Sequence, residues 1–457
     1  MDLDPMFYPE SVAVIGASDK EGKVGNAIMK SLDREFSGCI YPVNLKDDEV
    51  LGYKAYKSVS EIDSDVDLAV VAIPAKFVPD LVKECGENDI RNMVVVSAGF
   101  REAGREDLEN DLKKYSDEYD INIIGPNCLG VYNSEIGLDT IFNPPERQAR
   151  PDEGRVAFLS QSGAFGAAIL DWFSEADIGI SKFVSYGNRA DIDEADLIEY
   201  LNGDEETEVI TYYIEGVKDG RKFMKAADRC DKPIIALKSG RTSEGSSAAS
   251  SHTASLAGKD GVYKGAFKQS EVIRVYSLRE LFNLVKAISS QPPANGSNIS
   301  VVTNGGGAGV MTTDALVDIG MNLACLTKTT RRKFREAVKE GRIPEHATTQ
   351  NPVDIIGDAP SERYQEAMRI VLEDDNTDGL IVICLFQSPA LDEDIVEKIS
   401  EMKKYDKPII CVPPGGKYTH SITAKIEDEG IPVYQTPEEA VEAMWGLAEC
   451  GKCGDKF

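Results

Sequence analysis

Residues 154–173 read GRVAFLSQSGAFGAAILDWF: a short apolar run, a turn of small residues, and then a segment of helical character. The same order recurs in residues 11–32, SVAVIGASDKEGKVGNAIMKSL, and in residues 298–320, NISVVTNGGGAGVMTTDALVDIG. Buried-type strands that alternate with helices are typical of parallel sheets covered by helices on both faces. The sequence therefore predicts an α/β protein with three such regions in series.

Two stretches rich in turn-forming residues separate these regions. Residues 141–154, IFNPPERQARPDEG, combine prolines with charges, and residues 289–298, SSQPPANGSN, combine proline, glycine and serine. Such compositions are typical of linkers. We therefore predict three domains, over residues 1–145, 146–290 and 291–457.

Length and charge limit the classes of partner. A chain of 457 residues is too long to fold around one compact core. Its formal net charge of −28 disfavours nucleic acid and anionic membranes as main partners. No apolar stretch approaches the roughly 20 residues of a membrane helix, and the N-terminus lacks the features of a signal peptide. Nine scattered cysteines suit a reducing compartment. A cytoplasmic protein is expected.

The first glycine-rich turn is a candidate phosphate site. The apolar run of residues 11–15 leads directly into Gly16, Ala17 and Ser18, where small residues let backbone N–H groups meet a phosphate. The spacing is not GxGxxG, so the turn is a weak dinucleotide signal. Lys46 stands where NAD-binding units usually place an acidic residue, and a lysine suits a ribose that bears a phosphate, as in coenzyme A or NADP.

Two further turns have the composition of oxyanion sites. One follows residues 154–159 and the other follows residues 298–302, and each begins a helix with little bulk. Backbone amides and a helix dipole at such a turn favour a bound anion. The candidate phosphate-binding residues are Ser160, Gln161, Ser162 and Gly163 in the first turn, and Asn304, Gly305, Gly306 and Gly307, after Thr303, in the second.

One histidine stands in a segment that cannot pack a core. His252 lies within residues 243–258, SEGSSAASSHTASLAG, whose small polar neighbours predict a mobile loop. A histidine that attacks phosphorus needs one free ring nitrogen and a fixed acceptor for the proton on the other nitrogen. Glu215 follows a predicted strand and suits that second role. The other two histidines, His346 and His420, are interpreted as surface or core residues without a catalytic role. Cys450 and Cys453 form a lone CxxC in a tail expected to fray, so we predict no metal site.

These motifs, in this order, resemble the α subunit of ADP-forming acyl-CoA synthetases, relatives of succinyl-CoA synthetase. The resemblance rests on residues 154–166, 212–219, 238–258 and 301–310, with GPNCLG at 125–130 and NPVDIIG at 351–357 as further pieces. It covers essentially the whole chain. It implies a Rossmann-like CoA-binding domain followed by two flavodoxin-like ligase domains with parallel sheets. It also implies the reaction acyl-CoA + ADP + phosphate ⇌ carboxylic acid + CoA + ATP.

The resemblance also implies roles for individual residues. His252 would be the phosphorylated residue, on a swinging loop, and Glu215 the carboxylate that orients it. The two turns named above would hold phosphate beside the histidine. Besides Gly16, the positions that fall where the family contacts CoA are Ser18, Lys20, Lys23, Lys46, Ser97, Ala98 and Gly99. Family members commonly have glycine where this chain has Ala254, which limits the backbone freedom of the loop.

The resemblance implies a partner as well. The sequence contains no P-loop motif, and the ATP-grasp domains of the family would need about 200 further residues. A separate nucleotide-binding β subunit that holds ADP or ATP with Mg²⁺ is therefore expected, in an α2β2 assembly. Two alternatives stay open: a CoA-binding regulatory module related to the non-catalytic half of protein acetyltransferases, and an NADP-dependent oxidoreductase.

Overall fold

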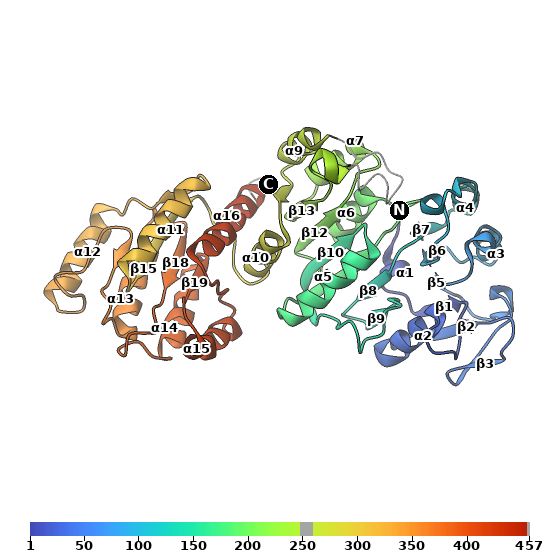
Figure 1. Ribbon diagram of the computed structural model, residues 1–457, viewed down its shortest axis with the longest axis horizontal. Helices are drawn as coiled ribbons and strands as arrows, with labels where there is room; N and C mark the ends of the chain where they lie inside the picture. The colour runs from blue at the N-terminus through green and yellow to red at the C-terminus, as the bar shows by residue number, and fades with distance from the viewer. Residues whose placement is uncertain (247–258, 455–457) are drawn as a thin grey trace. The chain divides into compact units, whose positions relative to one another are not determined.

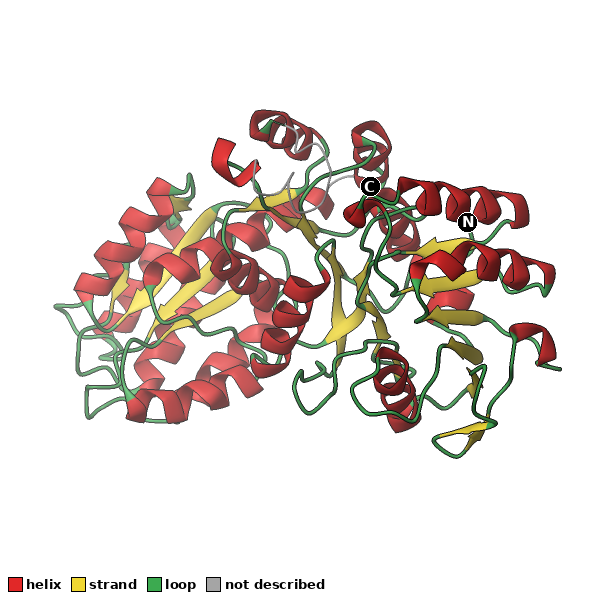
Figure 2. Ribbon diagram, turned by 45° about the vertical axis from the view of Figure 1, so that its right-hand side comes forward, coloured by secondary structure: helices red, strands yellow, loops and turns green. Residues whose placement is uncertain are grey.

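The computed structural model describes residues 1–246 and 259–454, and its chain forms two compact units, residues 1–276 and 277–457, which are described separately. The predicted α/β class is confirmed, because each unit consists of parallel sheets with helices on both faces (Figures 1 and 2). The first unit contains two large sheets and the second contains one. Among the described residues, no helix has the length and apolar character needed to cross a membrane.

The first sheet has the strand order β2-β1-β5-β6-β7, with all strands parallel. Ala13 and Val14 on β1, an interior strand, are fully buried, as expected for a strand covered on both faces. A two-stranded hairpin, β3 and β4, stands apart from the sheet. The elements are α1 (Asp4–Phe7), β1 (Ser11–Ile15), α2 (Val24–Glu35), β2 (Cys39–Val43), β3 (Glu49–Val50), β4 (Tyr53–Lys54), β5 (Leu68–Val71), α3 (Val78–Glu87), β6 (Asn92–Val95), α4 (Glu106–Tyr119) and β7 (Asn122–Ile124).

The second sheet has the order β14-β13-β12-β10-β11-β8-β9, in which the first five strands are parallel. That parallel part follows the 2-1-3-4-5 order of flavodoxin-like folds. The elements are β8 (Gly130–Asn133), β9 (Leu138–Asp139), β10 (Glu153–Ser160), α5 (Gly163–Glu175), β11 (Ile180–Ser185), α6 (Glu194–Gly203), β12 (Val209–Ile214), α7 (Gly220–Asp228), β13 (Ile234–Lys238), α9 (Asp260–Gln269) and β14 (Ile273–Val275).

β8 and β9 are not predicted by the sequence patterns, because they are four and two residues long and contain no β-branched run. β8 pairs antiparallel with β11, so residues before position 145 complete the second sheet. One hydrophobic cluster also links the two sheets, from Val14 on β1 to Ile210 on β12. The two sheets of this unit therefore share a core.

The second unit repeats the flavodoxin-like arrangement, with the order β16-β15-β18-β19 and with β17 paired to β15. Apolar clusters cover both faces of the sheet. The elements are α10 (Leu278–Ile288), β15 (Asn298–Thr303), α11 (Gly306–Asp318), β16 (Asn322–Leu323), α12 (Lys328–Lys339), β17 (Val353–Asp354), α13 (Ser361–Leu372), β18 (Gly379–Ile383), α14 (Ile395–Ser400), β19 (Ile409–Val412), α15 (Lys417–Asp428) and α16 (Pro437–Gly454).

Two details of the second unit differ from simple expectation. The C-terminal segment does not fray before Gly454, because α16 continues to that residue and buries Cys450. Helix α10 packs against α16. The Tyr434 hydroxyl, shortly before α16, donates to the Asn283 carbonyl on α10 at 2.6 Å. The domain boundaries at 145 and 290 stay predictions.

Candidate functional site

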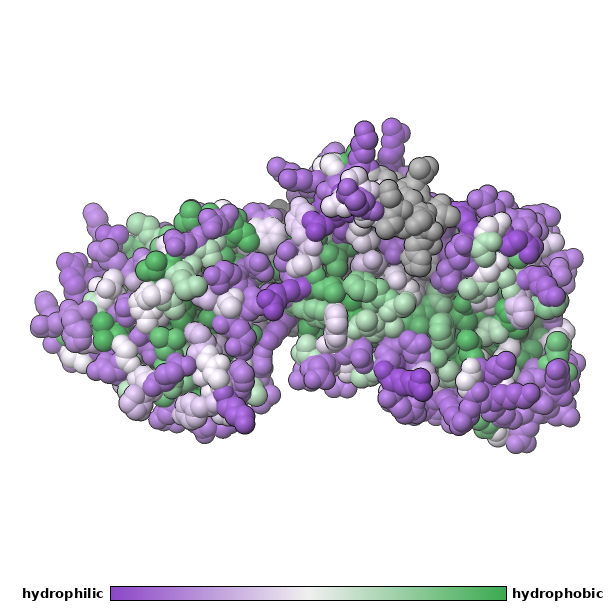
Figure 3. Space-filling view, viewed as in Figure 1, coloured by the Kyte–Doolittle hydropathy of each residue, from purple (hydrophilic) through white to green (hydrophobic). Residues whose placement is uncertain are grey.

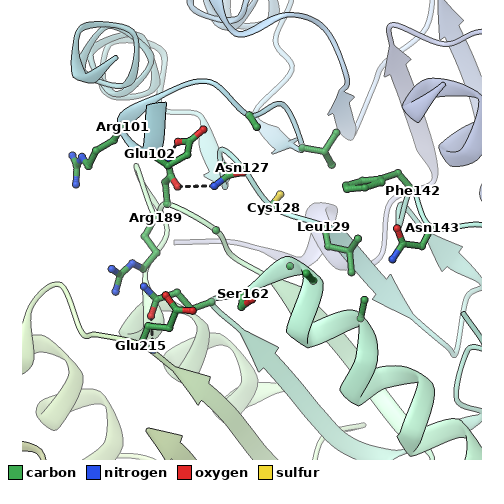
Figure 4. A pocket seen from close by; sticks show the side chains of 18 residues that line it. Arg101, Glu102, Asn127, Cys128, Leu129, Phe142, Asn143, Ser162, Arg189 and Glu215 are labelled. Atoms are coloured by element: carbon green, nitrogen blue, oxygen red, sulfur yellow. Dashed lines mark hydrogen bonds between the residues drawn. The ribbon is translucent and has the colours of Figure 1, made fainter. Parts of the chain in front are cut away.

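A cavity of about 620 Å³ lies in the first unit, where the carboxyl ends of strands from its two sheets meet. Ligands of open α/β sheets bind at such strand ends. Figure 4 shows Ser162 at the start of α5, with Glu215 on one side and Leu129 and Phe142 on the other. The cavity is lined by Val96, Ala98, Arg101, Glu102, Asn127, Cys128, Leu129, Phe142, Asn143, Gln161, Ser162, Gly163, Ala164, Ala167, Gly187, Asn188, Arg189 and Glu215.

Helix α5 begins at the wall of this cavity. β10 ends at Ser160, whose hydroxyl donates to the carbonyl of Ser162 at 2.7 Å and closes the turn. Ser162 is the N-cap, and its side chain accepts from the backbone N–H of Phe165 at 3.3 Å. The free N–H groups of the first helical turn and the helix dipole make this wall suited to an anion.

Glu215 stands directly after β12 and is 7% exposed. Its backbone N–H and that of Gly216 both donate to the side-chain oxygen of Gln161, at 2.9 and 3.0 Å. The Arg189 guanidinium, which also pairs with Glu194, donates to the Gly216 carbonyl. Burial raises the pKa of Glu194, although the Arg189 guanidinium opposes that rise. The structure therefore brings Glu215 and the α5 turn together.

The wall contributed by the first sheet is built around Glu102. Its carboxylate accepts from the backbone N–H groups of Gly99 at 2.5 Å and Phe100 at 3.1 Å, and from the Asn188 amide at 2.6 Å. Burial disfavours the ionised form, but these hydrogen bonds outweigh burial and lower the pKa of Glu102. Asn188 is also bonded to Asn127 at 3.2 Å, so this wall is fixed by contacts between the two sheets.

The predicted CoA positions occupy different places. Ala98 lines the cavity, whereas the Ser97 hydroxyl donates to the Ile73 carbonyl at 2.6 Å and the Gly99 N–H is taken by Glu102. Gly16 has φ +92°, and a Cβ there would stand 2.6 Å from the Ala72 carbonyl oxygen, so the first turn needs glycine. Ser18 accepts from the Lys20 N–H at 3.1 Å, and the Lys46 side chain is exposed.

Lys23 lines a second cavity of about 800 Å³, between α2 and the segment after β9, and Phe142 lines both cavities. Lys30, Arg34 and Arg147 also line it, and Glu21 lies 3.5 Å from the Lys30 ammonium. Of the other predicted CoA positions, Ala98 alone lines one of these two cavities.

The remaining predicted residues lie elsewhere. The turn Asn304–Gly307 lies at the start of α11 in the second unit. His252 and Ala254 lie outside the described residues. His346 and His420 are exposed, as their interpretation as residues without a catalytic role allows.

Sequence reasoning missed several residues of the cavity, among them Asn127, Phe142, Asn188 and Arg189. Asn127 lies in GPNCLG, which follows β7 as the candidate turns follow their strands, so its place after a strand was an available signal. Arg189 follows β11 in the same way. Phe142 lies in a predicted linker and offered no signal.

Comparisons with known proteins agree with the fold. Three family models match in order: a CoA binding domain over residues 10–134, a succinyl-CoA ligase like flavodoxin domain over residues 153–288, and a ligase-CoA domain over residues 299–448. The three domains, in this order, are thus those of the CoA ligases.

Individual relatives narrow this class. The α subunit of ADP-forming acetate–CoA ligase II from Pyrococcus furiosus is 40% identical, over 98% of this chain and 98% of that protein. ADP-forming acetate–CoA ligase I from Archaeoglobus fulgidus is 42% identical over 99% of this chain. A dinucleotide forming acetyl-coenzyme A synthetase 1 from Ca. Korarchaeum cryptofilum, solved with phosphate and ADP, matches with a TM-score of 0.92 at 35% identity, covering 99% of this chain and 98% of that one. The chain belongs to the family of ADP-forming acetate–CoA ligases, which confirms the resemblance.

The relatives differ in how much of their length is matched. This chain spans 64% of the Archaeoglobus fulgidus enzyme and 62% of the ADP-forming acetate–CoA ligase of Methanocaldococcus jannaschii, but nearly all of the Pyrococcus furiosus α subunit.

Proposed function

We propose that this chain acts as the α subunit of an ADP-forming acid–CoA ligase of the acetate–CoA ligase type. The reaction would be acyl-CoA + ADP + phosphate ⇌ carboxylic acid + CoA + ATP. The observation that carries the proposal is that Glu215 and the N-terminus of α5 line one cavity. The names of the relatives support the same activity, and they favour it over a regulatory module or an NADP-dependent oxidoreductase.

The proposed chemistry has three steps. A phosphate oxygen attacks the thioester carbon of acyl-CoA, the carbon–sulfur bond breaks, and acyl phosphate and CoA result. A ring nitrogen of His252 then attacks the phosphorus, and the carboxylate leaves. Last, the terminal phosphate oxygen of ADP takes the phosphoryl group from the histidine. Formation of a covalent intermediate divides one difficult transfer into two easier ones.

The residues of the cavity fit the first two steps. Phosphate would bind at the N–H groups that follow Ser162, with the second turn, Asn304–Gly307, as a further phosphate site. Glu215 would accept a hydrogen bond from the far ring N–H of His252 and stabilise the positive charge that develops on the ring. The apolar side chains of Leu129 and Phe142 offer a surface for the acyl group.

The proposal also says where CoA and the nucleotide would bind. The match of residues 10–134 to a CoA binding domain supports CoA on the first sheet, near Gly16, Ser18, Lys20, Lys23, Lys46 and residues 97–99. ADP or ATP with Mg²⁺ would bind mainly on a separate ATP-grasp β subunit in an α2β2 assembly, and we expect the enzyme in the cytoplasm. The near-complete match to a protein named as an α subunit supports a partner subunit.

The test is a mass spectrum of the assembled enzyme after incubation with acetyl-CoA and phosphate. We expect an acid-labile phosphate on His252 that disappears when ADP is added. A His252→Asn variant is the control and should remain unmodified. If the enzyme turns over while His252 stays free of phosphate, the proposal is wrong.

A further inference from the structure

The side chain of Gln161 holds the backbone on which Glu215 stands. Gln161 is 8% exposed, and its oxygen accepts from the N–H groups of Glu215 and Gly216 at 2.9 and 3.0 Å. Because both partners are donors, only the oxygen of the amide can serve them. A buried acceptor with two donors leaves little freedom to the backbone of residues 215 and 216.

The same short segment is held from two other directions. Arg189, after β11, donates to the Gly216 carbonyl, and the Tyr263 hydroxyl on α9 accepts from the Val217 N–H at 3.0 Å. The Arg189 side chain is only 8% exposed, and its charge is balanced by Glu194. Three elements therefore fix residues 215–217, and of the three residues involved, Gln161 alone belongs to the α5 turn.

Gln161 thus belongs to the α5 turn through its backbone and contacts the Glu215 segment through its side chain. Its backbone stands between Ser160, the last residue of β10, and Ser162, the N-cap of α5. Its side chain holds the residue that carries the carboxylate. A shift of the α5 turn by an angstrom would therefore shift Glu215 in the same direction, and the reverse holds as well.

We propose that Gln161 is a positioning residue that sets the place of Glu215 relative to the N-terminus of α5. The proposal rests on the function proposed above for Glu215 and for the α5 turn. Gln161 also lines the cavity, but the role proposed for it acts through the position of Glu215. Its effect belongs to phosphoryl transfer, because misplacing a reacting group by about 1 Å costs roughly 100-fold in rate.

The experiment measures single-turnover phosphorylation by acyl-CoA and radioactive phosphate, with the chain co-expressed with its nucleotide-binding subunit. Gln161→Met keeps the length of the side chain and removes the acceptor, so we expect about a 100-fold slower phosphorylation with an unchanged KM for acyl-CoA. Gln161→Glu keeps an oxygen for both N–H groups, and we expect a rate within about tenfold of the wild type. Its added charge should instead raise the KM for phosphate.

A matched control is available in the second unit. Gln291 is also 8% exposed, and its oxygen accepts from the Ile409 N–H at 2.8 Å, far from Glu215 along the chain. Gln291→Met also removes the bonds that the Gln291 amide donates to the Ser290 and Gly430 carbonyls, at 3.0 and 2.6 Å. It should lower the thermal unfolding temperature while leaving the phosphorylation rate within about twofold, because only structural hydrogen bonds are lost. If Gln161→Met does not fold, Gln161→Asn withdraws the amide by one methylene and should show the same loss of rate.

The outcomes separate the two proposals. If the wild-type enzyme turns over without a phosphorylated chain, the proposed function fails and this inference fails with it. If the wild type is phosphorylated and Gln161→Met matches Gln291→Met in rate, the inference alone is overturned. Equal losses in Gln161→Met and Gln161→Glu would also overturn it, because the acceptor would then be irrelevant.

Discussion

The turns that begin α5 and α11 share one backbone design but differ in the side chain they present. In the first turn the Ser160 hydroxyl donates to the Ser162 carbonyl at 2.7 Å, and in the second the Thr303 hydroxyl donates to the Gly305 carbonyl at 3.0 Å. Each closing hydroxyl belongs to the last residue of the strand. The two turns are therefore the same local structure, formed by different residues.

The next residue in each turn carries an amide that reaches the neighbouring strand. Gln161 accepts from residues 215 and 216, whereas Asn304 accepts from the Leu385 N–H at 2.9 Å and donates to the Leu385 carbonyl at 3.2 Å. Ser160 pairs with Tyr213 and Thr303 pairs with Ile383, so Glu215 and Leu385 occupy equivalent positions, two residues further on. The framework is common to both turns, but the equivalent position carries a carboxylate in the first and the Leu385 side chain in the second. The carboxylate beside the second turn comes from another strand, since a Cβ at Gly306 would stand 2.8 Å from an Asp354 oxygen.

The two helices also share an apolar outer face. Ala164, Ala168 and Trp172 on α5 are exposed, and Figure 3 shows hydrophobic side chains gathered over this helix. On α11, Val310 and Met311 are more than half exposed. The similarity of the two units thus extends from the turn along the helix. The difference between Glu215 and Leu385 therefore stands out against an otherwise shared structure.

The largest expected effect comes from replacing Glu215 by leucine, the residue at the equivalent position of the second unit. Glu215→Leu gives the first turn the side chain of the second, and we expect phosphorylation of the chain to slow by about 1,000-fold, in the range found when an acid–base group is lost. Glu215→Gln should show a similar loss, because an amide cannot stabilise the histidine cation as a carboxylate does. The measurement is radioactive phosphate incorporation from acyl-CoA and phosphate. A loss of less than about fivefold would remove Glu215 from the proposed chemistry.

The second prediction concerns the amide in the turn of α11. Asn304→Leu leaves the Leu385 N–H without its partner, whereas the Leu385 carbonyl keeps the Ser388 N–H at 3.3 Å. We expect the substitution to cost about 1–3 kcal/mol, the usual cost of one buried unsatisfied group. Urea unfolding can be followed at Trp445, the tryptophan of the second unit, after Trp172→Phe has removed the other of the two tryptophans. Asn304→Asp keeps the acceptor and should lose about half as much. Equal stability of all three proteins would show that the amide does not hold this turn.

Local sequence patterns predict much of this comparison but not its decisive contacts. The strand–turn–helix units around Gly163 and Gly306 follow from apolar runs that end in small residues, and the strand end at Glu215 follows from the same pattern. Gln161 stays a predicted phosphate-binding residue, and no local pattern predicts that its side chain also holds residues 215 and 216, which follow it by more than 50 positions. Contacts between distant segments depend on strand order and register, which no local pattern encodes. The short strands β8 and β9 escape prediction for the opposite reason, since they contain too few residues to form a pattern.

The third prediction uses the space around the glycines of the two turns. A Cβ at Gly305 would stand 2.2 Å from the Leu385 side chain, whereas a Cβ at Gly163 would meet nothing closer than 3.5 Å. We therefore expect Gly305→Ala to cost about 1–3 kcal/mol through overpacking, and Gly163→Ala to change stability by less than about 1 kcal/mol. The readout is urea unfolding at Trp445 for Gly305→Ala and at Trp172 for Gly163→Ala. Leu385→Ala combined with Gly305→Ala should recover part of the loss, and a purely additive double variant would contradict the steric explanation.

The smallest expected effect concerns the caps of the two helices. Ser162 caps α5 through its side chain, whereas Gly305 at the same place before α11 has none to offer. Ser162→Ala should therefore cost about 1 kcal/mol, in the range found for lost N-caps, and Ser162→Thr should restore most of it. The Phe165 N–H that loses its partner lies in the helical turn proposed to bind phosphate. Phosphate should therefore stabilise Ser162→Ala more than the wild type, because the anion can take the released donor. Equal stabilisation of both proteins by phosphate would indicate that the anion does not use this end of α5.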